Sequence, residues 1–172
     1  MKGNKFYLDL ENKINFDVVC KNWLKFMSYG ISYDAVCATL KECKLFNTEL
    51  TVRFTNNKEI KKLNKLWRKK NIPTNVLSFP NKNNVNILKT FNYIGDIVVS
   101  YDKIIEESIK YNISFGNHVI HLIIHGILHL AGYDHENVKG EKKMISIEEK
   151  IMKEIGISAC GFELNMKYGE RS

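Results

Sequence analysis

The feature that most constrains this chain is an apolar run that carries every histidine of the protein within eighteen residues. The histidines are His118, His121, His125, His129 and His135. The other residues between 118 and 130 are nearly all apolar, which is typical of a helix buried on almost every side. Because helix residues follow one another at about 100°, the first four imidazoles share one stripe. A buried polar group without a partner costs about 1–3 kcal/mol, so this stripe predicts polar contacts inside the protein.

The spacing of the last three histidines predicts a metal site. His125 and His129 are four residues apart, so they project from one face of a helix, one turn apart. Gly132 can end this helix because glycine adopts the left-handed conformation at little cost, and His135 can then approach from another direction. Three imidazoles can bind the zinc of a catalytic site and leave its fourth coordination position open. We therefore expect one Zn²⁺ per chain, although imidazoles also suit nickel, copper and iron.

The metzincin proteases have the same histidine spacing, but a glutamate follows their first histidine and activates the zinc water. Gly126 stands at that position here and cannot accept a proton. A metzincin-like metallohydrolase would need another base, such as Asp134, so the pattern disfavours proteolysis. Asp134 has two further interpretations, because it can orient a ligand imidazole or cap the turn after Gly132. The sequence leaves the roles of His118, His121 and Asp96 open.

The rest of the sequence predicts a mixture of strands and helices. Hydrophobic alternation indicates strands at residues 5–10, 50–54, 76–79 and 93–100. Helical patterns cover residues 14–44, as one or two helices broken near Gly30, and then residues 57–70, 101–113, 115–132 and 140–155. Residues 81–91 are polar and predict a loop. We expect an α+β fold, one domain over residues 1–172, with a small mixed sheet of about four strands and five to six helices around a buried histidine-bearing helix.

The formal net charge of +7 indicates either a solvated basic surface or a polyanionic partner such as RNA or DNA. Many of the cations fall in the predicted helix at 57–70 and share one broad face: Lys58, Lys61, Lys62, Lys65 and Lys69. Arg68 lies at the end of this helix. A face of this kind is either simply solvated or follows a phosphate backbone. We expect RNA contacts at Lys61, Lys65 and Lys69.

Hydropathy and cysteine spacing favour a cytoplasmic protein. No apolar run reaches the roughly 18 residues that span a bilayer, and residues 6–10 are too short and acidic for a signal peptide. The four cysteines form no C-x-x-C pair, which favours reduced thiols. We expect no membrane partner, and the oligomeric state is not indicated.

Three blocks of the sequence resemble the YbeY family of bacterial metal-dependent endoribonucleases. The stretch HLIIHGILHLAGYDH at 121–135 resembles the family signature. The stretch LNKLWRKKNIPTNVLSFP at 63–80 is similar to the family segment L-N-x-x-(Tyr/Trp)-R-x-K-D-x-P-T-D-V-L-S-F-P. Gly95-Asp-Ile97, followed by Val-Val-Ser, matches a family strand. The resemblance covers about residues 48–155, and Asn71 and Asn75 stand where the family usually has aspartate.

The resemblance implies a zinc-dependent, single-strand-specific endoribonuclease acting in 16S rRNA 3′-end maturation and ribosome quality control. Its partners would be single-stranded RNA, rRNA and the small ribosomal subunit. The matching His125, His129 and His135 would hold the zinc. Arg68 matches a functionally important arginine, and a guanidinium suits the oxygens of a phosphoryl group. Either a water or the ribose 2′-OH would be the nucleophile.

A second hypothesis is a non-catalytic, rRNA-binding ribosome assembly factor with a structural zinc. The number of protein ligands distinguishes the two hypotheses, because a catalytic zinc keeps an open position. A fourth protein ligand, such as Asp134 or His121, would favour the structural role.

Overall fold

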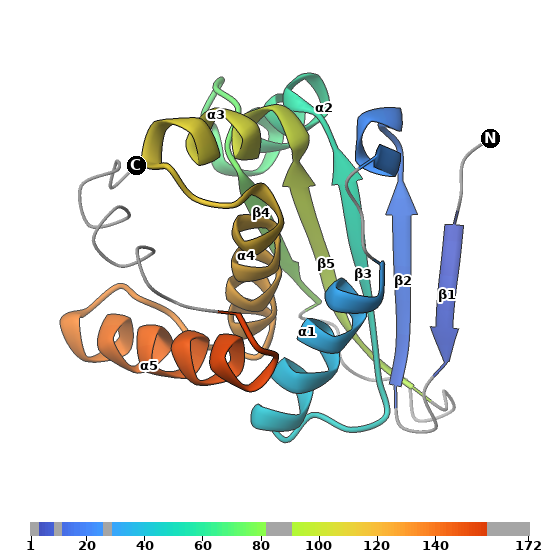
Figure 1. Cartoon of the computed structure of the whole chain (residues 1–172), viewed down its shortest axis with the longest axis vertical. Helices are drawn as coiled ribbons and strands as arrows, with labels where there is room; N and C mark the ends of the chain where they lie inside the picture. Colours follow the sequence, from blue (N-terminus) through green and yellow to red (C-terminus); the bar gives the residue numbers. More distant parts are fainter. Residues whose placement is uncertain (1–3, 9–11, 26–28, 82–90, 158–172) are drawn as a thin grey trace.

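The computed structural model describes residues 4–8, 12–25, 29–81 and 91–157. Within these residues a five-stranded mixed sheet has the strand order β1-β2-β3-β5-β4 (Figure 1). The strands are β1 (Asn4–Leu8), β2 (Asn12–Val18), β3 (Thr48–Thr55), β4 (Val76–Pro80) and β5 (Asn92–Ser100). Strands β2, β3 and β5 are parallel, whereas β1 and β4 pair antiparallel with β2 and β5. The two antiparallel strands therefore form the edges of the sheet.

Helices cover both faces of this sheet. They are the short 3₁₀ helix η1 (Lys21–Lys25) and the α-helices α1 (Tyr29–Glu42), α2 (Asn57–Arg68), α3 (Tyr101–Tyr111), α4 (Phe115–Leu130) and α5 (Val138–Glu154). Helices α1 and α4 pack on one face of the sheet, and α5 crosses next to both (Figure 1). Helix α2 lies against β4 and β5 on the other face, where its Ile60 packs with Leu77 of β4 and Val98 of β5. The predicted α+β class and the buried, histidine-bearing α4 are confirmed.

The prediction of helix throughout residues 14–44 is wrong for its first part. Residues Asn12–Val18 form β2, which gives the sheet one strand more than the expected four. Their side chains alternate between buried and half-buried positions, with Ile14 and Phe16 in the core. A period of two is the pattern of a strand with one face buried. Gly30 does not break a helix, because it lies in the first turn of α1.

The other predicted elements agree with the structure to within a few residues. Asn56 caps α2, since its side chain accepts a hydrogen bond from the Glu59 backbone N–H at 3.1 Å. Ser114 holds the N-cap position of α4 but makes no capping hydrogen bond with its side chain. Most of the predicted loop at 81–91 lies outside the described residues.

Two glycines allow α4 to pack closely on the sheet. A Cβ at Gly126 would lie 2.9 Å from Ile97 Cγ2 of β5. Gly95 has φ +140°, and a Cβ there would lie 2.2 Å from the Phe79 carbonyl oxygen and 3.0 Å from Leu130 Cδ2. The last turn of α4 therefore rests directly on the pairing of β4 with β5.

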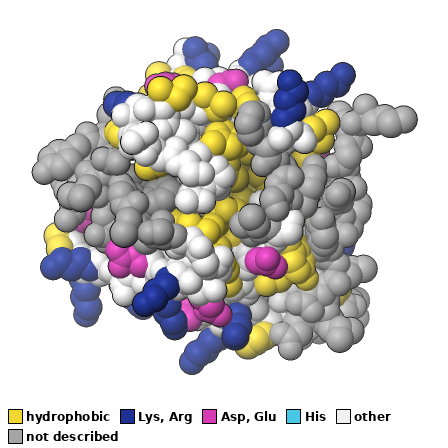
Figure 2. Space-filling model, in the orientation of Figure 1, with side chains coloured by type: hydrophobic (Ala, Val, Ile, Leu, Met, Phe, Trp, Pro, Cys, Tyr) yellow, Lys and Arg dark blue, Asp and Glu magenta, His cyan; other side chains and the backbone are white. Residues whose placement is uncertain are grey.

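Among the described residues, no single helix is both long and apolar enough to cross a membrane. Helices α3 and α4 meet those criteria only when taken together, and they are bent by 117° where they meet. Cys20, Cys37 and Cys43 form no disulfide with the described residues, and Cys160 lies outside them. On the face shown in Figure 2, Lys and Arg side chains project mainly from the periphery.

Candidate metal centre

The end of α4 forms a turn that brings the chain back toward its own histidines. Gly132 has φ +87°, its N–H donates to the His129 carbonyl, and the Tyr133 N–H donates to the Leu128 carbonyl. This is the pair of hydrogen bonds that defines a Schellman motif, in which glycine is preferred. The prediction that Gly132 ends the helix is therefore confirmed. The chain then continues to His135 beside the last turn of α4.

His125, His129 and His135 meet at this end of α4. One ligand atom from each lies within 4.8 Å of the others, so these three side chains could hold a metal ion. The Nε2 atoms of His125 and His129 are 3.0 Å apart. The ring centre of His135 is 5.6 Å from that of His125 and 5.1 Å from that of His129. His125 and His129 are half-buried, whereas His135 is exposed, so the group opens to solvent on one side.

Hydrogen bonds on the far side of two rings determine where their protons lie. His125 Nδ1 is 2.8 Å from Glu148 Oε1, and His129 Nδ1 is 3.1 Å from the Tyr133 carbonyl oxygen. A carboxylate and a carbonyl only accept, so each Nδ1 carries the proton and each Nε2 keeps a lone pair. Two lone pairs 3.0 Å apart repel each other unless a cation or a proton lies between them. The donor set therefore fits a divalent cation.

The pKa values agree with this arrangement. Burial would raise the pKa of Glu148, but hydrogen bonds from His121 and His125 outweigh it and lower the pKa to about 2. Burial lowers the pKa of His129 to about 4, and the repulsion that protonated His125 or His135 would exert on a second positive charge lowers it further. His129 is therefore neutral at pH 7, and neutral imidazole is the form that binds a metal.

Glu148 is a site residue that the sequence reasoning did not find. It lies on α5 and is 7% exposed, and it accepts hydrogen bonds from both His121 Nε2, at 3.1 Å, and His125 Nδ1. Its neighbours one turn away, Met144 and Met152, are in the apolar core. The sequence did contain a signal for Glu148, because it lies on the apolar side of an amphipathic helix. A carboxylate buried in this way needs hydrogen-bonding partners.

The other two histidines of the stripe contact carboxylates rather than the metal group. His121 is bound by Glu148, and His118 Nε2 lies 2.7 Å from Glu107 Oε2 of α3. The same Glu107 oxygen accepts a hydrogen bond from Asn75 Nδ2 at 3.0 Å. An aspartate at position 75, as is usual in the YbeY pattern, could not donate this bond. Asn75 therefore has a structural partner at the start of β4.

Asp134 and Asp96 make contacts away from the three histidines. Asp134 Oδ1 accepts a hydrogen bond from the Glu136 backbone N–H at 3.2 Å, which favours the turn-capping interpretation. Asp96 accepts a hydrogen bond from the Tyr93 side chain, and burial together with this bond raises the pKa of Tyr93. Asp96 shares the sheet face of Val98, which packs under α2, so it lies on the opposite face from α4.

Arg68 lies at the end of α2, close enough that its charge contributes to lowering the pKa of His129. It is exposed, and it makes no ion pair with the described residues. The segment that follows α2 crosses to the edge strand β4, which also contacts α4. Strand β4 therefore connects the helix that carries Arg68 to the helix that carries His125 and His129, more than fifty residues later in the sequence.

The predicted RNA-binding lysines lie on the surface of α2 and at its end. Lys61, Lys65 and Lys69 are all exposed. Lys69 falls after the last helical residue, where it adopts the left-handed conformation with φ +61° and its Nζ donates to the Leu66 carbonyl at 3.1 Å. The helix therefore ends slightly before the expected residue 70.

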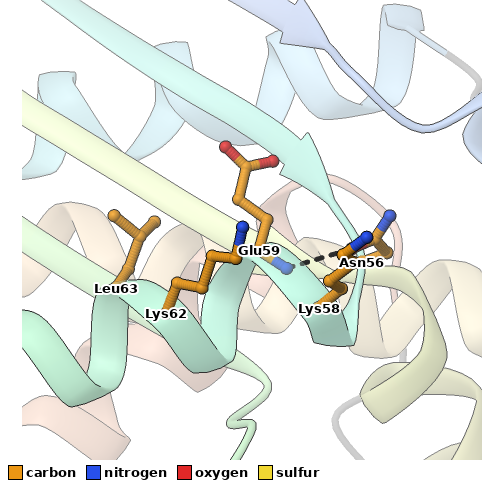
Figure 3. Close-up of a pocket in the computed structure, with 5 residues that line it drawn as sticks. All are labelled: Asn56, Lys58, Glu59, Lys62 and Leu63. Atoms are coloured by element: carbon orange, nitrogen blue, oxygen red, sulfur yellow. Dashed lines mark hydrogen bonds between the residues drawn. The ribbon is translucent and has the colours of Figure 1, made fainter.

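A pocket of about 400 Å³ lies at the start of α2 and contains no histidine. Its lining residues are Asn56, Lys58, Glu59, Lys62 and Leu63 (Figure 3). The Glu59 side chain points toward β3 in Figure 3, where Arg53 Nη2 donates to it at 2.6 Å. None of the lining residues belongs to the three-histidine group, so the pocket and the candidate metal centre are formed by different residues.

Comparison with known proteins identifies the family. A sequence model described as endoribonuclease YbeY matches residues 21–156. The chain belongs to the YbeY family. An endoribonuclease YbeY from Vesicomyosocius okutanii is 42% identical over 119 residues, covering 69% of this chain and 81% of that protein. One from Ehrlichia canis is 36% identical over 148 residues, covering 84% of this chain and 94% of that protein.

A solved structure supports the same fold. The solution structure of TM1509 from Thermotoga maritima has a TM-score of 0.54 and 28% identity, covering 84% of this chain and 91% of that chain. The YbeY match extends over η1 and α1, which the sequence resemblance at 48–155 did not reach. The predicted family is confirmed.

Proposed function

We propose that this chain is a zinc-dependent endoribonuclease that cleaves single-stranded RNA and acts in 16S rRNA 3′-end maturation and ribosome quality control in the cytoplasm. Family membership supports RNA cleavage by hydrolysis. The observation that carries the proposal is the convergence of three imidazoles at the end of α4, where one ligand atom from each lies within 4.8 Å of the others. We further propose that the chain works as one domain and that its RNA is bound to the small ribosomal subunit.

His125, His129 and His135 would hold the zinc in this proposal. When bound, a divalent cation supplies positive charge that polarises a phosphoryl oxygen and favours ionisation of water. Arg68 would bind the oxygens of the scissile phosphate, because its planar guanidinium offers two parallel donors. Glu148 already accepts two imidazole N–H groups, so it positions His121 and His125 and does not serve as the proton acceptor.

The contacts of the two candidate fourth ligands favour catalysis over a structural zinc. His121 Nε2 is directed at Glu148, and Asp134 caps the turn through the Glu136 N–H. Among the described residues, the group of possible ligands contains only the three histidines. Three protein ligands leave a position open, as in catalytic zinc sites.

The test is cleavage of a single-stranded rRNA fragment by the purified protein, with the same sequence in a duplex as the control substrate. His129→Ala should abolish cleavage and zinc binding together. Arg68→Ala should slow cleavage on the order of 10²-fold while zinc content is retained, because one stabilising group for the phosphoryl charge is lost. Arg68→Lys keeps the charge but not the two-donor geometry, so we expect an intermediate rate. Equal cleavage by His129→Ala and the unmodified protein would identify a contaminating nuclease and refute the proposal.

The lysines of α2 are tested by the salt dependence of RNA binding. Each lysine that contacts a phosphate of a single strand contributes about 0.7 to the slope of log K against log salt concentration. Replacing Lys61, Lys65 and Lys69 together by glutamine should therefore flatten this slope. A control protein with Lys110, Lys142 and Lys153 replaced has the same change in net charge on other elements. Equal slopes in the two variants would show that the α2 lysines act only through net charge.

A further inference from the structure

The end of α2 exposes an unusual amount of apolar surface. Trp67 is 65% exposed, Leu66 is 60% exposed and Ile72, in the segment after the helix, is 53% exposed. Tryptophan usually buries most of its side chain, since its indole is among the largest apolar groups. The other tryptophan of the chain, Trp23, follows that rule and is fully buried. An exposed indole therefore requires an explanation beyond the fold.

The Trp67 ring is supported on one side by the protein. It contacts Phe79 of β4 edge-on, with ring centres 5.9 Å apart and an angle of 63° between the ring planes. Phe79 in turn packs against the buried cluster of Ile60, Leu77 and Val98. Such a contact limits the orientations of the indole while most of its surface stays open to solvent. A supported, open aromatic ring is suited to stacking with a flat ligand.

The charges around Trp67 indicate the chemistry of that ligand. The neighbouring Lys65, Arg68, Lys69 and Lys70 are all exposed cations. Between Glu59 and Asp96 the chain contains no other acidic residue. The centres of protein–protein interfaces are poor in lysine, so this concentration of positive charge favours a polyanion over a protein partner. A polyanion that also presents flat apolar groups is a nucleic acid with unstacked bases.

We propose that Trp67 is a stacking platform for one unpaired RNA base, next to the nucleotide whose phosphate Arg68 binds. This inference rests on the proposed function and adds a determinant of substrate choice to it. In a duplex both faces of an internal base are covered by its neighbours, so only an unpaired base can leave the stack to lie on an aromatic side chain. Trp67 would therefore favour single strands directly, in addition to the cations, which bind any phosphate backbone.

Tryptophan fluorescence reports this contact, because the chain has only Trp23 and Trp67 and Trp23 is buried. We would use the full-length His129→Ala protein, so that the RNA stays intact, with two oligonucleotides of equal length. One is a single-stranded oligouridylate, and the other is an abasic strand with the same number of phosphates. Oligouridylate should quench the emission and the abasic strand should not. Trp67→Leu should weaken binding of oligouridylate about 5- to 150-fold, measured by anisotropy of labelled RNA.

Two further variants separate stacking from general effects. Trp67→Phe keeps an aromatic face and should retain most of the affinity, whereas Ile109→Ala removes another exposed apolar side chain, on α3, and should change nothing. Thermal unfolding of each variant checks that the fold is intact. Unchanged affinity in Trp67→Leu, or equal binding of the abasic strand and oligouridylate, overturns the proposal and leaves the apolar surface to a protein partner.

The proposal and the proposed function fail in different ways. Quenching by oligouridylate without cleavage by the unmodified protein would support the stacking platform and refute the endoribonuclease. Cleavage by the unmodified protein, with full RNA affinity in Trp67→Leu, would refute the platform and support the endoribonuclease.

Discussion

At the scale of single residues, Glu148 shows how one buried carboxylate organises the metal centre. It accepts hydrogen bonds from His121 and His125 and thereby directs the lone pair of His125 Nε2 toward His129. Groups that orient metal-ligating histidines in this way contribute to affinity without touching the metal. The α5 helix is therefore part of the site, although none of its residues belongs to the candidate ligand group.

Glu148→Gln should weaken zinc binding by about 10- to 100-fold, the usual effect of losing such a partner. A glutamine amide is uncharged and has only one acceptor oxygen, so it cannot accept hydrogen bonds from both imidazoles as the carboxylate does. The proton of His125 is then held less firmly at Nδ1. Competition with a chromophoric chelator measures the affinity, and circular dichroism checks the fold. Glu149→Gln is the matched control, because Glu149 is the exposed neighbour on the same helix. Equal zinc affinities for the two variants would show that Glu148 has no part in binding.

At the scale of elements, Gly126 allows α4 to pack closely on the sheet and also leaves the site without the catalytic glutamate of a metzincin. Gly126 stands where a metzincin has its catalytic glutamate, but here the position faces Ile97 of β5. A side chain at this position would point into the sheet and not into the metal site. The absence of a base at position 126 is thus a consequence of how closely the helix packs.

Gly126→Ala should lower the free energy of unfolding by about 1–3 kcal/mol, because the new methyl group would lie 2.9 Å from Ile97 Cγ2. Gly116→Ala, in the first turn of the same helix, meets no atom closer than 3.9 Å and should be neutral or stabilising, since alanine favours helix. Urea denaturation of both variants provides the comparison. Equal effects of the two substitutions would contradict the packing argument.

At the scale of the whole molecule, an ion-pair network connects elements on the α2 side of the sheet. Arg53 of β3 pairs with Asp17 of β2 and donates to Glu59 of α2 from Nε, at 3.0 Å, and from Nη2. Partial burial would raise the pKa of Glu59, but the hydrogen bonds from Thr55 and Arg53 and the charge of Arg53 lower it. The network ties the start of the lysine-bearing helix to the centre of the sheet.

The depressed pKa of Glu59 predicts a pH dependence of stability. Folding favours the ionised form, so its contribution is complete above the ordinary glutamate pKa of about 4.3 and is lost as the pH falls toward the lower folded value. The difference in unfolding free energy between the native protein and Glu59→Gln should therefore shrink as the pH falls below about 4.3. Denaturant unfolding from pH 7 to pH 3 measures it, and parallel curves for the two proteins would contradict the assignment.

The sequence alone determined the parts of this protein that depend on local patterns. The apolar surroundings of the histidines predicted a buried helix, and the spacing of His125, His129 and Gly132 predicted a ligand pair followed by a helix stop, because these features need only helical geometry. The same reasoning misassigned residues 14–18, which belong to β2. This strand pairs with residues 48–54, so it is stabilised from outside its own segment.

Only the tertiary structure decided which distant groups complete the site. Glu148 of α5 reaches His125 of α4 across 23 residues, and helix α2 with Arg68 at its end is placed by its packing against β4 and β5. Such contacts arise from packing between elements, and no periodicity in the chain encodes them. The ligand pair His125 and His129 could therefore be predicted from the sequence of one helix. The role of Glu148 in orienting His125, and the exposure of the Trp67 indole, depend on how the helices pack on the sheet and on one another.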